Sequence, residues 1–300
     1  MHREPDTDSF SELRLLLTKE PHYIHFREIL YHIQQIQSSQ EQAMAIDYAE
    51  QHLGSWEDKH RSADLGSLWL NFPEGELSLI SSLIRHVDLS YRTIGYKGIK
   101  AITQTPYLSK VTELDVSNCQ LGPKAAAAIA QSPYMKQLKR LSASRNMIGF
   151  KGVKSLASSS ALENLQELDL MYDNIETSGA KALAQSLHIT KLEKLFLYAS
   201  YIEDEGLTAL VHSPNAKNLR HLVLTYAKIT DAGVKEITQT TNLECLESLI
   251  LNNNEISDRG AMLLAGATNL PKLTKLSLRD NPLTEEGQAA LASQISDTKN

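Results

Sequence analysis

The sequence predicts an α/β solenoid, in which one parallel sheet lines the concave side of a horseshoe and helices cover its convex side. An eleven-residue apolar pattern recurs eight times at a constant 27-residue step, without an insertion. After each copy, apolar residues follow three or four positions apart, as on one face of a helix. The acidic residues 1–83 lack the pattern, which divides the chain near residue 83.

Each copy fits the template L-x-x-L-x-L-x-x-N-x-I, whose positions are numbered 1 to 11 below. The copies begin at residues 84, 111, 138, 165, 192, 219, 246 and 273. The central L-x-L alternates with a period of two residues, which predicts a short half-buried strand. A helix between two such strands returns the chain to the same end, so we expect all strands to be parallel.

The second half of each copy has the features of a helix. Thr230, Ser257 and Thr284 stand where an N-cap is expected, and an acidic residue follows each of them. A small residue recurs four positions after the template and is expected to let the helix lie close to the strand layer. It is glycine in all repeats but one: Gly98, Ala125, Gly152, Gly179, Gly206, Gly233, Gly260 and Gly287.

The template and its helical second half resemble the leucine-rich repeat of the ribonuclease-inhibitor type, over residues 84 to about 291. The resemblance implies that the position-9 side chain lies inside the turn and satisfies backbone groups there. In this chain the position-9 column is irregular and weakens in repeats five and six. It consists of Arg92, Cys119, Asn146, Asp173, Ser200, Ala227, Asn254 and Asn281.

The segment 1–83 is expected to be an acidic helical cap on the first repeat, before a leucine-rich repeat domain at 84–300. It carries 6 basic and 14 acidic residues, whereas the rest of the chain carries 24 and 22. Helices are predicted within 9–20, 22–37 and 40–53. A solenoid needs its terminal repeats covered, which favours the cap over the alternative, a separate interaction module.

The bulk composition excludes several classes of function. A net charge of −6 gives no general attraction to nucleic acid or to anionic lipid. No apolar run approaches the roughly 18 residues of a membrane span, and the N-terminal ten residues lack the apolar core of a signal peptide. Two cysteines fit a reducing, cytoplasmic compartment. No motif indicates a cofactor, a metal or a catalytic residue.

Positions 3, 5 and 7 are predicted to face the hollow of the horseshoe. There, repeats four to seven carry apolar and aromatic residues, while repeats one to three carry acids and serines. Rigid aromatic side chains on a concave surface are typical of protein-binding sites. The residues expected to contact a protein partner are Met171, Tyr172, Phe196, Tyr198, Val223, Tyr226 and Ile250, with Asp169, His221 and Asp115 beside them.

Two other interpretations of these aromatics stay open. β-Branched and aromatic residues suit strands in any case, and neighbours on adjacent strands can pack on one another. The N-terminal segment could also fold back over the hollow. Near the first repeats, His86, Asp88, Glu113 and Asp115 form a polar square that fits a metal site, an acidic part of the binding face, or ordinary solvated charge.

The expected function is non-enzymatic binding of one protein partner on the concave face, by a chain that is monomeric when free. The chain is similar to ribonuclease-inhibitor-type proteins and to leucine-rich effectors of intracellular bacterial pathogens, which implies an inhibitor, or an effector delivered into the host cytosol. A different class shares the repeat. Ran GTPase-activating proteins act on a bound GTPase, and Arg92 and Arg145 near the strand ends fit that alternative.

Overall fold

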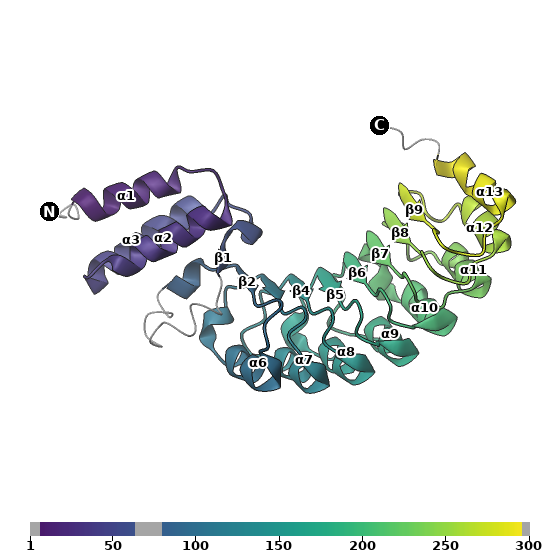
Figure 1. Cartoon of the computed structure of the whole chain (residues 1–300), viewed down its shortest axis with the longest axis horizontal. Coiled ribbons are helices and arrows are strands. Elements are labelled where there is room, and N and C mark those ends of the chain that lie inside the picture. The colour runs from purple at the N-terminus through teal and green to yellow at the C-terminus, as the bar shows by residue number, and fades with distance from the viewer. Residues whose placement is uncertain (1–6, 64–79, 296–300) are drawn as a thin grey trace.

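The structure, a computed structural model, describes residues 7–63 and 80–295. These residues form an arch whose inner side is a single parallel sheet and whose outer side is a row of helices (Figure 1). Neighbouring strands in the sheet are consecutive in the chain, so each repeat contacts chiefly the repeats before and after it. The α/β solenoid predicted from the sequence is therefore confirmed.

Each strand is three residues long in the repeats and begins at position 3 of the template. Registered partners always occupy the same template position in adjacent repeats, for example Leu114 with Leu141 and Leu141 with Leu168. The strands of the repeats are β2 His86–Asp88, β3 Glu113–Asp115, β4 Arg140–Ser142, β5 Glu167–Asp169, β6 Lys194–Phe196, β7 His221–Val223, β8 Ser248–Ile250 and β9 Lys275–Ser277.

One helix follows each of these strands and packs against the helices of the adjacent repeats. The helices are α6 Gly95–Thr103, α7 Gly122–Ala130, α8 Gly149–Ala157, α9 Glu176–Ala184, α10 Glu203–His212, α11 Asp231–Gln239, α12 Asp258–Ala265 and α13 Glu285–Ile295. Short 3₁₀ turns lead from some helices into the next strand, at η3 Pro106–Leu108, η4 Ser160–Leu162 and η5 Pro214–Asn218.

The helices begin in two different ways. In the last three repeats the predicted N-caps are confirmed, because Thr230, Ser257 and Thr284 each accept a backbone N–H of the first turn. Each cap hydroxyl also donates to an aspartate of the preceding repeat, as Thr230 does to Asp204 at 2.6 Å. In the first five repeats the helix instead begins at a residue with positive φ, which is glycine in three of them and Glu176 or Glu203 in the others.

The small-residue column has a different cause from the one expected. A side chain on Gly98 or Gly152 would collide with the γ2 methyl of the isoleucine four residues earlier, and on Gly233 with the Asp204 carboxylate. The glycines of the middle repeats also face the preceding helix rather than the strand layer. Ala125 fits because the residue four before it is Leu121, which has no γ2 methyl. Contacts within the turn and with the helix of the preceding repeat, not contact with the strand layer, therefore fix this column.

The position-9 column behaves as the resemblance implied wherever it is asparagine. Asn146 accepts the Cys119 N–H at 2.8 Å, and its amide donates to the carbonyls of Val116 and Ala143 at 2.8 and 2.7 Å. Asn254 makes the corresponding bonds two repeats from the C-terminal end. This side chain joins two repeats and closes its own turn at the same time.

Asp173 occupies the same place but lacks the amide donors. One carboxyl oxygen accepts the N–H groups of Asn146 and Ile148 at 2.8 and 3.0 Å, while the other is buried without a hydrogen-bond partner. By analogy with Asn146, that second oxygen faces backbone carbonyls, to which only a protonated carboxyl can donate. Burial raises the pKa of Asp173 to about 7.

We predict that Asp173→Asn stabilises the protein above neutral pH. A carboxyl whose pKa rises on folding contributes its full stability below pH ~4 and loses it as the pH rises through about 7. At pH 8 the variant should therefore gain on the order of a few kcal/mol in the free energy of unfolding, measured by denaturant titration. The gain should vanish toward pH 4.

Asn146→Asp is the matched reverse substitution and should destabilise the protein at pH 8 but recover in acid. An Asp173→Asn variant with unchanged stability at pH 8 would contradict the inference that the carboxyl meets carbonyls.

The N-terminal segment forms three helices and adds a strand to the sheet. The helices α1 Thr7–Leu17, α2 Tyr23–Gln35 and α3 Ser39–Leu53 match the predicted ranges. The sheet has nine strands rather than the expected eight, because β1 Ser62–Ala63 pairs with β2. The Arg61 carbonyl accepts the N–H groups of Arg85 and His86, which extends the backbone ladder by one rung. Residues 64–79 of the predicted cap lie outside the described residues.

Glu50 on α3 ties these helices to the sheet. Its two carboxyl oxygens lie 2.7 Å from Arg61 and 2.6 Å from Arg85, on either side of the β1–β2 pair. Arg61 is 4% exposed and also donates to the Leu83 carbonyl at 2.9 Å. We therefore propose that residues 1–83 cap the first repeat, with the boundary at residue 83 predicted above.

We predict that Glu50→Gln loosens this cap. It leaves the buried Arg61 without its counter-charge, and the cost should be about 1–2 kcal/mol, less than for a fully buried pair because the Glu50 side chain is 40% exposed. Hydrogen exchange should rise in α1–α3 and change little in α8–α12. Glu57→Gln is the control, because its pair with Lys59 is exposed. Equal effects of the two substitutions would contradict the cap.

Candidate functional site

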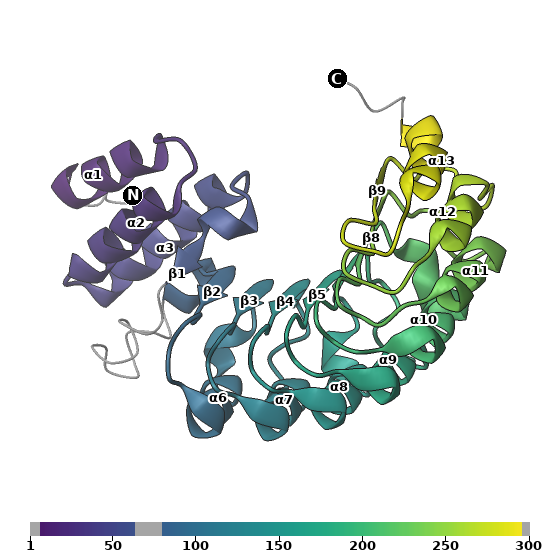
Figure 2. The same cartoon turned by 45° about the vertical axis from the view of Figure 1, so that its right-hand side comes forward.

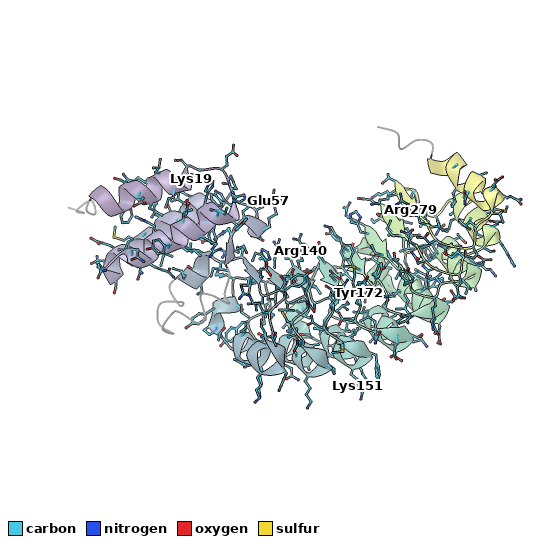
Figure 3. All side chains as sticks on the ribbon, in the orientation of Figure 1. Lys19, Glu57, Arg140, Lys151, Tyr172 and Arg279 are labelled. Carbon is cyan, nitrogen blue, oxygen red and sulfur yellow. The ribbon has the colours of Figure 1, made fainter. Side chains whose placement is uncertain are left out.

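The alternation of buried and exposed residues in the middle strands agrees with the predicted phase. Leu195, Leu222 and Leu249 at position 4 are at most 1% exposed, whereas Phe196 and Val223 at position 5 are only half-buried. A shift of one residue would have reversed the two sets. Side chains at positions 3, 5 and 7 therefore face the hollow, as Figure 3 shows for Arg140, with Lys151 on the outer side.

The apolar side chains of position 5 form one continuous column. Phe196 is registered with Val223, and Val223 with Ile250, on three adjacent strands. Met171, at position 7 beside them, is also half-buried. Together with three tyrosines, these residues define the concave patch, which consists of Met171, Tyr172, Phe196, Tyr198, Val223, Tyr226 and Ile250.

The three tyrosines of the patch form a ladder along its rim. The ring of Tyr198 lies 4.7 Å from that of Tyr172 and 5.5 Å from that of Tyr226. Tyr172 and Tyr226 stand at position 8, whereas Tyr198 stands at position 7. Position 8 of the intervening repeat is Ala199, whose small side chain leaves the space that Tyr198 fills.

Arg145 extends the ladder by one rung. Its guanidinium lies 4.0 Å from the centre of the Tyr172 ring, close enough for a cation–π interaction. The hydroxyl hydrogen bond with Tyr172 is the main reason that the pKa of Tyr198 rises to about 12, so the Tyr198 hydroxyl stays neutral at physiological pH. Sequence reasoning did not place Arg145 in the patch, although position 8 read as a ladder (Arg145, Tyr172, Ala199, Tyr226) carries that signal.

The tyrosines do pack sideways on one another, which was one of the alternative interpretations of these aromatics. This packing still leaves them accessible to solvent. Tyr172 remains 40% and Tyr226 46% exposed. Position 8 has positive φ in every repeat, so the left-handed backbone at these tyrosines belongs to the architecture and does not itself mark a site. Each turn is held by a backbone bond to the next repeat, such as Tyr172 N–H to the Tyr198 carbonyl at 2.8 Å.

The polar residues predicted beside the patch lie on the same face. Asp115 and Asp169 each accept a backbone N–H two residues further on, at 2.8 and 3.0 Å. Burial is the main reason that the pKa of Asp169 rises to about 6. His221 is half-buried and lies two residues before Val223 on the same side of β7.

A ladder of ion pairs runs along position 3, which sequence reasoning missed. Arg140 lies 3.1 Å from both Glu113 and Glu167, and Lys194 lies 3.1 Å from Glu167. The predicted polar square near the first repeats does not act as one cluster. Glu113 is paired with Arg140 in this ladder, whereas Asp88 accepts the backbone N–H of Ser90 two residues further on. The described residues contain no cluster of three or more potential metal ligands.

The described helices of the N-terminal segment do not cover the patch. They contact β1, the turn before β2 and one another, and they stand at the β1 end of the sheet (Figures 1 and 2). Within the part of the chain that the structure describes, no helix is both long and apolar enough to span a bilayer. A cavity of about 20 Å³ behind β6, lined by Leu192 and Leu195, is far below the size of a cofactor site.

The stacked repeats and their position-9 ladder define the class: the chain is a leucine-rich repeat protein. A family model described as "Leucine Rich repeat" matches residues 107–130, 161–184, 215–237, 242–265 and 269–292. The match is to the repeat and does not distinguish the ribonuclease-inhibitor type. No curated protein matches the sequence.

Several solved structures are similar to this chain at low identity. An internalin from Listeria monocytogenes has 20% identity and a TM-score of 0.43, covering 73% of this chain and 62% of that one. A chain of the Rad7 and Elc1 complex in yeast has 16% identity and a TM-score of 0.45, covering 86% of this chain and 73% of that one. A protein from Bacteroides fragilis has 14% identity and a TM-score of 0.47, covering 79% and 71%. This chain thus spans less than two thirds of the internalin.

We predict that two neighbouring substitutions on β6 differ sharply in cost. Leu195→Ala removes a side chain that is 1% exposed and should cost about 2–5 kcal/mol of unfolding free energy. Phe196→Ala removes a half-buried side chain from the open face and should cost about 1 kcal/mol. Denaturant titration of both variants measures the difference. A larger loss for Phe196→Ala would reverse the assignment of faces.

Proposed function

We propose that the chain is a non-enzymatic protein-binding module that holds a protein partner on the concave patch. The observation that carries the proposal is the continuity of the patch, because Phe196, Val223 and Ile250 are registered on adjacent strands and remain partly exposed. A covered aromatic side chain alone buries about 150–250 Å². Several aromatic and aliphatic side chains together reach the few hundred Å² at which an apolar patch marks an interaction site.

Rigidity supports the same proposal. The tyrosine ladder holds Tyr172, Tyr198 and Tyr226 against one another, so little side-chain freedom remains to be lost when a partner binds. Such preordered aromatics are the side chains on which binding energy concentrates. The polar residues Asp115, Asp169 and His221 supply a rim on the same face.

We predict that Phe196→Asp with Tyr198→Asp abolishes partner binding while leaving the fold intact, since neither side chain belongs to the core. Affinity capture compares this double variant with the wild type, with circular dichroism to check the fold. The matched control is Leu187→Asp with Tyr31→Asp, which alters exposed apolar residues outside the patch. Partners retained by the patch variant would contradict the proposal, and partners lost only by the control would move the site elsewhere.

The finer form of the proposal is a regulator of its partner, such as an inhibitor or a bacterial effector. The free chain is then a monomer that works in the cytosol of its own cell or of a host. An inhibitor or adaptor saturates at one molecule per partner, whereas an activator of a GTPase acts at substoichiometric amounts. Stacking of Arg145 on Tyr172 favours the binding role, because it holds this arginine against the patch.

A further inference from the structure

The position-5 column changes its chemistry abruptly between β5 and β6. On β6, β7 and β8 this column contains Phe196, Val223 and Ile250. On β5 it contains Asp169, which is registered directly with Phe196. Asp115 follows two strands further on, beyond Ser142. One row of side chains therefore presents an apolar stretch and a carboxylate stretch end to end on the same open face.

The structure gives Asp115 and Asp169 of this row no counter-charge among the residues that it describes. Within the described residues, no ion pair reaches Asp115 or Asp169, although the position-3 ladder beside them pairs every one of its own acids from Glu113 to Glu167 with Arg140 or Lys194. Arg145, the cation at position 8 of the repeat between the two aspartates, is held over Tyr172. Each aspartate uses one oxygen for its own turn, and its second oxygen makes no hydrogen bond within the described residues.

The environment of Asp169 is one in which an external cation is favourable. Burial is the largest cause that raises its pKa, and the carboxylates of Asp115 and Glu167 raise it further. A cation placed against Asp169 offsets both repulsions and the cost of burying the carboxylate.

We propose that the concave patch binds a basic amphipathic helix of its protein partner, with the apolar side chains on Phe196, Val223 and Ile250 and with lysine or arginine side chains on Asp169 and Asp115. This inference rests on the proposed protein-binding function and specifies the partner. It also fixes a direction, because the basic end of the helix must point toward β3 and the apolar end toward β8.

The spacing of the sheet suits a helix that runs along the arch. Adjacent strands lie about 4.8 Å apart, and one turn of helix rises about 5.4 Å. Side chains three or four residues apart can thus face successive strands. Three apolar turns then cover β8, β7 and β6, a basic residue in the next turn meets Asp169, and another two turns further meets Asp115.

Charge also selects among occupants. The N-terminal segment, residues 1–83, carries 14 acidic and 6 basic residues. Its net negative charge does not complement the carboxylates of the row, whether the segment comes from the same chain or from a second molecule. Nucleic acid is unfavourable at the same carboxylates. A basic helix satisfies both halves of the row.

The test selects helical peptides, long enough for six turns of helix, from a randomised display library against the wild-type protein. We expect the selected peptides to carry apolar residues on three successive helical turns and lysine or arginine at one end of that stretch. Acidic residues should be depleted at the same end. Synthetic copies of the selected peptides are then measured by fluorescence anisotropy. Asp115→Asn with Asp169→Asn should weaken binding at least about tenfold in low salt, and added salt should weaken binding to the wild type.

The control is Glu163→Gln with Glu244→Gln, which removes the same charge from exposed loops away from the hollow and should change affinity less than about twofold. Selected peptides without basic residues, or with affinity unchanged by the two asparagines, would overturn the basic-helix inference. Affinity unchanged by Phe196→Asp with Tyr198→Asp would instead overturn the concave patch as the binding surface. Failure to enrich any helical peptide counts against the helix, while affinity capture still tests protein binding.

Discussion

The structure depends on the strict phase of the short strands, which recur at the same template positions in every repeat. Each strand turns its central apolar residue into the core and both neighbours to the open face, and the backbone ladder joins every repeat to the next. An inserted residue would turn the central side chain outward and break the ladder on both sides. Because the central residues hold the phase, most side chains at positions 3, 5 and 7 stay outside the core, with Ser144, Thr225 and Ser248 as the buried exceptions. Their identity varies along the arch while the strands keep the same register.

The position-9 column shows where the architecture is least uniform. Asparagine satisfies both donors and acceptors in the turns around Asn146 and Asn254, but Asp173, Ser200 and Ala227 lie between them and make fewer of these bonds. These three repeats are also the ones that carry most of the concave patch. This coincidence is consistent with the proposed binding role, because a functional site is where local departures from a consistent pattern are expected.

Sequence periodicity predicted the backbone well because each repeat solves the same packing problem. It gave the strand phase, the caps at Thr230, Ser257 and Thr284, and the helices of the N-terminal segment. It could not give β1, because residues 62–63 carry no apolar alternation and pair only through backbone groups. The reason for the glycine column was also out of reach, since it depends on spatial contacts: an isoleucine γ2 methyl in the same turn in the early repeats, and an aspartate of the preceding repeat in the last three.

The sequence allowed a prediction of which residues line up at each template position of the candidate site. It did not allow a prediction of which side chains contact one another. Columns follow from register alone, so the concave patch could be read from residue numbers. Whether Tyr198 leans toward the rim depends on the volume of Ala199, and whether Arg140 bridges two acids depends on side-chain reach across strands. These are properties of neighbours in space that a single repeat does not contain.

In the binding mode that we propose, the two halves of the position-5 column have different tasks. Apolar burial on Phe196, Val223 and Ile250 supplies affinity but discriminates weakly, because many apolar side chains fit an open sheet. Asp169 and Asp115, which have no ion pair among the described residues, would discriminate in this mode, because a partner without cations would leave both carboxylates desolvated and uncompensated. The position-3 ladder sharpens this selection, since Arg140 and Lys194 are already occupied and cannot turn to neutralise the aspartates. In the proposed mode, specificity on this face thus comes from the carboxylates that no described residue pairs.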